Sequence, residues 1–129
     1  MTPQTAPAVR ALEHPDRAAI RLESVLHALS DPMRLRVVRT LAAAEVELAC
    51  CDVELPVSKS TTTHHFRVLR EAGVIVQTYR GTSKMSGLRR DDLNALFPGL
   101  LDTVLTAAAG QSDRLTGDRL ADGRLIDVR

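Results

Sequence analysis

A short run near the middle of the chain carries side chains that can form hydrogen bonds with the edges of DNA bases or with phosphates. Lys59, Ser60, Thr63, His64 and Arg67 combine hydroxyl groups, an imidazole and two long cations. On an α-helix that begins at Lys59, these five side chains lie on one face. Polar side chains near the N-terminus of a helix are suited to the major groove of DNA. The spacing therefore predicts a helix face that reads DNA.

The residues around this run contain the signals needed to form that helix. Ser58 is a suitable N-cap, and Phe66, Leu69 and Ala72 form an apolar stripe on the opposite face. Gly73 suits the left-handed position that ends a helix. We therefore predict a recognition helix over Ser58–Ala72. His65 lies nearer its buried side, where we expect a partly buried, hydrogen-bonded imidazole rather than a ligand.

The segment after Gly73 has the pattern of a β-ribbon. Val74–Tyr79 is rich in β-branched residues, Arg80–Ser83 can form a turn, and Lys84–Leu88 can form a second strand. A recognition helix followed directly by a ribbon is typical of a winged helix. We expect the wing, Val74–Leu88, to lie on the DNA backbone or in the minor groove. The alternative is a plain hairpin whose charges are simply solvated.

The net charge of +1 hides a strong division of charge along the chain. Residues 58–90 carry a net charge of +6, whereas residues 1–57 carry −2 and residues 91–129 carry −3. A polyanion-binding surface requires such a local excess of cations. The three aromatic residues of the chain make base stacking an unlikely mode of binding.

Composition and length place the chain among globular proteins with one domain. It has 129 residues, of which 44% are hydrophobic, enough for a single core. It shows no apolar run of membrane-spanning length and no secretion signal, so we expect a cytoplasmic protein.

The remaining elements are predicted to form the core around the recognition helix. We expect a flexible arm over 1–16, a winged helix domain over 17–109 and a polar tail over 110–129. Within the domain, helices are predicted over Arg17–Leu29 and from Asp31-Pro32 to near Ala44. Residues 45–57 could form a strand or a short helix. The last helical region is expected to be capped by Asp91 or Asp92.

The chain contains few groups that could catalyse a reaction. Cys50 or Cys51 with His64 or His65 is the only combination of nucleophile and base, and no phosphate loop or catalytic carboxylate pair accompanies it. We therefore predict that the protein is not an enzyme.

The stretches LSDPMRLRVVRTL and SKSTTTHHFRVLREAGVI resemble the ArsR/SmtB family of bacterial winged helix repressors. The resemblance covers about residues 22–109. It implies a homodimer that binds an inverted-repeat operator and releases it when an inducer binds. It also implies base contacts from Lys59, Ser60, Thr63 and His64. The first and last helices of the family form the dimer, and the residues expected at that interface are Leu22, Val25, Leu101, Val104 and Leu105.

The resemblance is weaker at the inducer site. Members that sense arsenic and cadmium have ELCVCD before the recognition helix, and this chain has ELACCD. Cys51 matches the second thiolate, but Ala49 replaces the first. The other common metal site of the family is absent because no His follows His65. We assign no metal or cofactor, with a thiophilic ion or redox chemistry at Cys50 and Cys51 as the alternative.

These observations predict a mainly α protein with a small β-ribbon, in the winged helix-turn-helix fold. We expect it to regulate transcription and to bind no cofactor. A winged helix that binds only proteins remains the alternative from another functional class. The predicted DNA-binding residues are Ser58, Lys59, Ser60, Thr63, His64, Arg67, Arg80 and Lys84.

Overall fold

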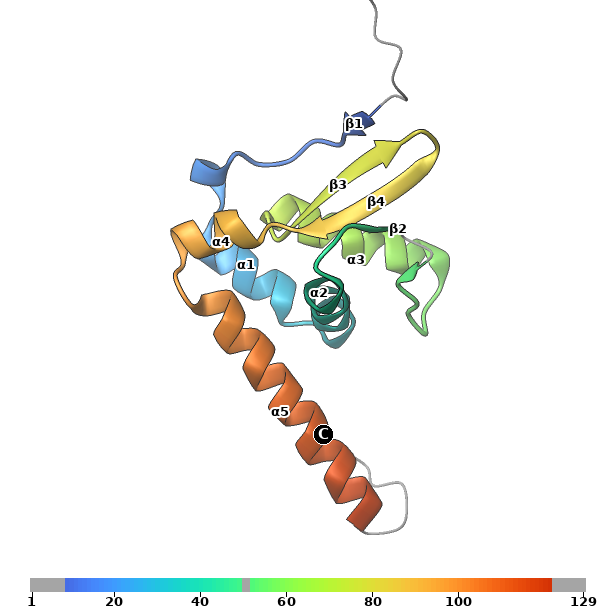
Figure 1. The fold of residues 1–129 in the computed structure, drawn as a ribbon, viewed down its shortest axis with the longest axis vertical. Coiled ribbons are helices and arrows are strands. Elements are labelled where there is room, and N and C mark those ends of the chain that lie inside the picture. The colour runs from blue at the N-terminus through green and yellow to red at the C-terminus, as the bar shows by residue number, and fades with distance from the viewer. Residues whose placement is uncertain (1–8, 50–51, 122–129) are drawn as a thin grey trace, which may run out of the picture.

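The computed structural model describes residues 9–49 and 52–121, and this part of the chain contains five α-helices and a four-stranded antiparallel sheet (Figure 1). The helices are α1 (Leu22–Leu29), α2 (Pro32–Ala44), α3 (Lys59–Ala72), α4 (Arg90–Leu96) and α5 (Leu100–Ala121). The strands are β1 (Val9–Ala11), β2 (Leu48–Ala49), β3 (Ile75–Arg80) and β4 (Ser83–Leu88), in the order β1-β3-β4-β2. The predicted mainly α fold with a small ribbon is confirmed.

Local capping explains where α2 and α3 begin. Asp31 Oδ2 accepts hydrogen bonds from the backbone N–H groups of Met33 (2.8 Å) and Arg34 (3.1 Å) at the start of α2. Ser58 Oγ accepts a bond of 3.2 Å from the backbone N–H of Thr61 at the start of α3. Each cap satisfies backbone donors that have no partner inside the helix. Both predicted caps are confirmed.

Gly73 ends α3 and also allows a close approach between two distant segments. Its φ of +88° is left-handed, and the backbone N–H of Val74 bonds to the carbonyl of Leu69. A Cβ atom at position 73 would lie 2.5 Å from Cγ1 of Ile20. Glycine is therefore required here both for the backbone conformation and for packing against Ile20.

The hydrophobic core lies where α1, α2 and α3 pack beneath the base of the sheet. Its fully buried members include Val25 of α1, Val38 of α2, Leu69 of α3 and Ile75 of β3. Leu101, at the start of α5, closes the core from the side of α4. The core thus fixes α3 relative to the hairpin of β3 and β4.

The structure differs from the predicted boundaries at three places. The helix expected over Arg17–Leu29 is a 3-10 turn, η1 (Arg17–Ala19), followed by α1. The two parts are separated because Ile20 is extended and buries its side chain against Gly73. Neither Asp91 nor Asp92 caps α4, since the N-cap is Arg89 and both carboxylates lie in the first turn. The helix α5 continues to Ala121, so the described part of the expected polar tail, residues 110–121, is helical.

The expected flexible arm is also different in its described part. Residues 9–11 form β1, which pairs antiparallel with β3 in the register Val9↔Arg80 and Arg10↔Tyr79. The backbone N–H of Leu12 then bonds to the carbonyl of Gln77. The structure also gives a strand in the ambiguous region, because β2 pairs with β4. The ribbon therefore has a neighbouring strand on each side.

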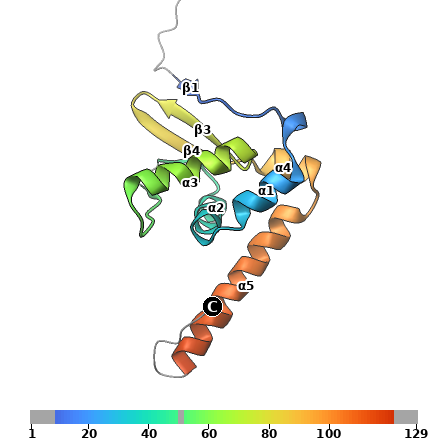
Figure 2. The same ribbon diagram turned by 180° about the vertical axis from the view of Figure 1, so that it is seen from behind.

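The long helix α5 extends away from the other elements, as the view in Figure 1 and the reverse view in Figure 2 both show. Its first turns pack on the core, and Ala108 is its last buried residue among those whose side chains are described. No single helix in residues 9–49 and 52–121 is long and apolar enough to span a membrane. Only α4 and the first part of α5 taken together reach that length and apolar composition, and the two helices are bent by 112° relative to each other.

Candidate nucleic-acid interface

The outer face of α3 exposes the five side chains that the sequence predicts for it. Lys59, Ser60, Thr63, His64 and Arg67 are all exposed, while Phe66 and Leu69 on the opposite face are buried. No carboxylate within the described residues forms an ion pair with Lys59 or Arg67. The face can therefore offer its cations to an anionic partner without breaking an internal ion pair.

Hydrogen bonds inside α3 limit what its threonines can do. Thr63 Oγ1 donates to the carbonyl of Lys59 (3.0 Å), and Thr62 Oγ1 donates to the carbonyl of Ser58 (3.0 Å). A hydroxyl group has one proton but two lone pairs. In this conformation Thr63 thus offers an acceptor to a base edge, so the exocyclic amino group of adenine or cytosine fits it.

The two adjacent histidines have different surroundings. His64 is exposed, and Arg67 Nη2 donates to its Nδ1 over 3.5 Å. His65 is only 8% exposed and its Nδ1 accepts a bond of 3.3 Å from Arg34 Nη1. Asp31 Oδ2 lies 3.9 Å from the same nitrogen, too far for a hydrogen bond. The expected structural role of His65 is confirmed.

The charge of +6 in residues 58–90 does not all face outward. Arg70 donates to Gln77 Oε1 (2.7 Å), and Arg89 donates to Asp92 and to the carbonyl of Pro15 (2.9 Å). Arg90 donates to the carbonyl of Ala42 (3.3 Å). These three arginines connect the elements of the fold. The cations left for a polyanion are Lys59 and Arg67 of α3 and Arg80 and Lys84 of the hairpin.

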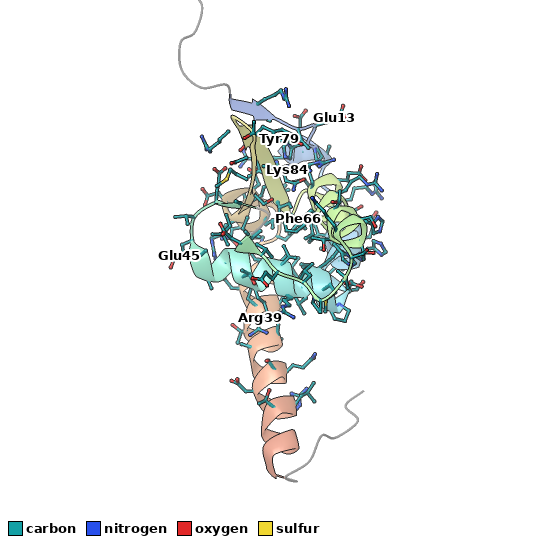
Figure 3. All side chains as sticks on the ribbon, turned by 90° about the vertical axis from the view of Figure 1, so that its right-hand side faces the viewer. Glu13, Arg39, Glu45, Phe66, Tyr79 and Lys84 are labelled. Atoms are coloured by element: carbon teal, nitrogen blue, oxygen red, sulfur yellow. The ribbon has the colours of Figure 1, made fainter. Side chains whose placement is uncertain are left out.

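The hairpin of β3 and β4 forms the wing and carries a cluster of cations around an aromatic ring. Arg10 Cζ lies 5.0 Å from the centre of the Tyr79 ring, and Lys84 Nζ lies 6.0 Å from it. The register explains this arrangement, because Arg10 and Lys84 are the partners of Tyr79 on the two neighbouring strands. Figure 3 shows the labelled Tyr79 and Lys84 on the wing, with Phe66 of α3 below them. We call Arg10, Tyr79 and Lys84 the wing cluster.

Arg80 has a partner that the sequence does not reveal. Its Nη2 lies 2.8 Å from Glu47 Oε1, which comes from the segment before β2. This exposed ion pair reduces the charge that Arg80 offers to DNA. The prediction that Arg80 contacts DNA remains untested, whereas Arg10, which was expected in a flexible arm, joins the wing. The short segment Val9–Ala11 gives no strand signal strong enough to predict this.

The residues expected at a dimer interface separate into two groups. Val25 and Leu101 are 1% and 2% exposed in the single chain, so their prediction as interface residues is wrong. Both belong to the hydrophobic core of the subunit. Leu22 and Leu26 of α1 are exposed, and Val104 and Leu105 of α5 are half-buried. These four residues are apolar surface on the first and last helices.

The predicted thiol candidates Cys50 and Cys51 lie outside the described residues. Among residues 9–49 and 52–121, no three His, Asp or Glu side chains come together as metal ligands. The alternative of a thiophilic ion therefore stays a hypothesis about the two cysteines.

Comparison with known proteins gives the class of this protein. The chain is 37% identical over 82 residues to YceK, an uncharacterized HTH-type transcriptional regulator of Bacillus subtilis strain 168, covering 62% of this chain and 82% of YceK. A crystal structure of an ArsR family transcriptional regulator covers 76% of this chain and 92% of its own, with a TM-score of 0.50 and 17% identity. The transcriptional repressor BigR of Xylella fastidiosa has a TM-score of 0.47 and 25% identity, covering 59% of this chain and 85% of its own. No protein-family model matches the chain.

The relative YceK identifies a DNA-binding regulator of transcription, which is a non-enzymatic class of protein. The fold of this chain is a winged helix-turn-helix. The chain belongs to the HTH-type transcriptional regulators, and its fold is similar to that of an ArsR family regulator. The predictions of a winged helix regulator of transcription and of a non-enzymatic function are confirmed.

Proposed function

We propose that the protein is a homodimeric repressor that binds an inverted-repeat operator, with α3 of each subunit in the major groove. The observation that carries this proposal is the outer face of α3. Its five polar side chains are exposed, Ser58 caps its N-terminus, and its cations have no ion-pair partner among the described residues. An N-terminal helix face of this kind reads base edges.

The wing cluster supports a second contact beside the groove. Arg10 of β1 and Lys84 of β4 flank Tyr79 of β3 in the sheet, and the hairpin of β3 and β4 follows α3 directly after Gly73. Cations at such a position contact phosphates and fix the orientation of the helix without reading sequence. In this proposal α3 supplies specificity, and the wing supplies affinity.

The proposed dimer forms through α1 and α5. Leu22 and Leu26 are 43% and 46% exposed, and they lie on the helix that precedes α2. A two-fold axis here would place the two α3 helices at half-sites separated by about one turn of DNA or a multiple of it.

The first experiment measures binding to the DNA upstream of the protein's own gene and to a scrambled duplex, over a range of salt concentrations. We expect a preference for the upstream duplex and an affinity that falls by roughly 1000-fold between about 50 and about 200 mM salt. Transcription from that DNA in vitro should decrease when the protein is added. Equal affinity for both duplexes would contradict the proposal and favour a winged helix that binds proteins.

The second experiment tests the dimer with Leu26→Glu. We expect this variant to sediment as a monomer and to lose most of its operator affinity, because a buried unpaired carboxylate is costly at an interface. Val46→Glu is the matched control, since Val46 is 64% exposed on a loop after α2. A monomeric wild type at micromolar concentration would remove the dimer from the proposal.

A further inference from the structure

A cleft opens between α3 and the wing, beside the face that is proposed to read DNA. It has a volume of about 400 Å³, within the range of roughly 300–1,000 Å³ that small-molecule sites have in proteins. Its apolar wall includes Val53, Leu55 and Phe66, and Lys59 and Lys84 also line it. We call this space the α3–wing cleft.

One wall of the cleft comes from the segment that precedes α3. Within the described residues 52–58 this segment contains no α-helix, and its irregular backbone places Val53, Glu54 and Leu55 at the cleft. Val53 of this segment is buried in the core, and Leu55 packs against the core while lining the cleft. The floor includes Gln77, whose side chain is already bonded to Arg70 and Ser86. The floor therefore needs no polar group from a ligand.

The charges at the cleft favour an anion. Lys59 and Lys84 have no ion-pair partner among the described residues, and Glu54 is the one carboxylate that lines the space within the described part of the chain. Two lysines beside an apolar wall complement a molecule with an apolar body and one acidic group. A purely polar anion would leave the apolar wall wet, and a neutral hydrocarbon would leave the two lysines without a partner.

We propose that the α3–wing cleft binds a small amphipathic carboxylate, which thereby weakens DNA binding. This inference rests on the proposed function, because Lys59 and Thr63 line the cleft and also belong to the proposed DNA-reading face. A ligand held by Lys59 and Lys84 withdraws both cations from DNA. By linkage, DNA then weakens binding of the ligand by the same factor.

The test uses the full chain and two probes, the fluorescent anion anilinonaphthalenesulfonate and decanoate. We expect the dye to bind, decanoate to displace it, and decanol and inorganic phosphate to compete at least about tenfold less well than decanoate. We also expect saturating decanoate to weaken operator binding by about tenfold or more. Equal competition by decanol or by phosphate would overturn the proposal, since it would show that the acidic group or the apolar body is not recognised.

Two variants connect these effects to the cleft. Leu55→Trp fills the space with a larger apolar side chain, and Val46→Trp makes the same change on an exposed residue elsewhere. We expect Leu55→Trp to bind decanoate about tenfold more weakly and DNA within a few-fold of wild type, and Val46→Trp to leave both unchanged. Wild-type affinity for decanoate in Leu55→Trp would overturn the proposal. If Leu55→Trp does not fold, the comparison of decanoate with decanol still decides it.

The two proposals fail in distinguishable ways. Decanoate binding is measured without DNA, and DNA binding is measured without decanoate. Loss of operator preference with intact decanoate binding contradicts the repressor but not the ligand site. If decanoate binds but does not change the affinity for the operator, the proposed effect of the ligand on DNA binding is contradicted, and the repressor proposal is not.

Discussion

Arg34, which is buried beneath α3, and Arg67, on its outer face, carry the same charge but differ in their partners. Arg34 is 7% exposed and donates to the carbonyls of Ala28 (2.8 Å) and His27 (3.3 Å) and to His65. Arg67, on the outer face, is exposed, and among the described residues its side chain hydrogen-bonds only to the imidazole of His64. The first kind of cation stabilises the fold, and the second kind is available to DNA. A net charge alone does not distinguish them.

The largest expected effect comes from removing an inner cation. Arg34→Met leaves two carbonyls and an imidazole nitrogen without their donor in a buried position, so we expect the free energy of unfolding to fall by about 3 kcal/mol. Urea unfolding at a fixed protein concentration measures it. Arg67→Met is the matched control and should change stability by less than about 0.5 kcal/mol. Equal losses in the two variants would break the division between inner and outer cations.

The next effect concerns an outer cation and appears in DNA binding. Lys59→Ala should lower the preference for the operator over scrambled DNA by about 2 kcal/mol, because a cation at the start of α3 is placed to reach a base edge. Lys84→Ala, on the wing, should weaken binding to both duplexes alike. Fluorescence anisotropy with each duplex gives the four affinities. The same loss of preference in both variants would argue against α3 as the element that reads sequence.

A smaller effect is expected from the cation that β1 adds to the wing. Arg10→Ala removes one proposed phosphate contact, so the slope of log K against log salt should become shallower by about 0.9. The preference between duplexes should stay the same. Arg21→Ala is a suitable control, because Arg21 is an exposed arginine at the start of α1 that pairs with Glu23. An unchanged slope in Arg10→Ala would place β1 outside the DNA contact.

The smallest expected effect is that the attachment of β1 to β3 weakens at low pH. His14 Nε2 accepts a bond of 2.8 Å from the backbone N–H of Gln77, and burial, with help from the charges of Arg89 and Arg70, lowers the pKa of His14 below 6.5. The neutral ring therefore stabilises β1 above pH 6.5, and this stabilisation is lost as the pH falls through the lowered pKa.

Amide exchange at Gln77 measures the attachment of β1. The protection of this amide should decrease on acidification. His14→Gln should remove most of this pH dependence, although the exposed His64 remains in that variant. Protection that stays constant on acidification from above pH 6.5 until the whole protein unfolds would contradict a role for the His14 bond.

Local signals account for the elements that the sequence predicts well. The caps at Asp31 and Ser58, the stop at Gly73 and the stripe of Phe66 and Leu69 act within one or two helical turns. The residues that flank them therefore suffice to predict α2, α3 and the exposed face of α3. The hairpin follows for the same reason, because its turn and both strands are adjacent in sequence.

Pairings between distant segments account for what the sequence does not show. β1 pairs with β3 across more than sixty residues, as the bond between His14 and Gln77 illustrates. Arg80 pairs with Glu47, and Val25 and Leu101 turn into the core rather than toward a second subunit. No local pattern records these contacts, because each depends on how α1, α2 and α3 pack.

The sequence by itself determined α2, α3 and the hairpin, the class of protein and the side chains that α3 exposes, since periodicity and capping are properties of neighbouring residues. Only the tertiary structure decided which of the cations in residues 58–90 are free for DNA. The tertiary structure also brings the segment before α3, α3 itself and the wing together as the walls of one cleft. The physical reason is that a charge acts through its nearest partners, and those partners come from parts of the chain that meet only in the folded protein.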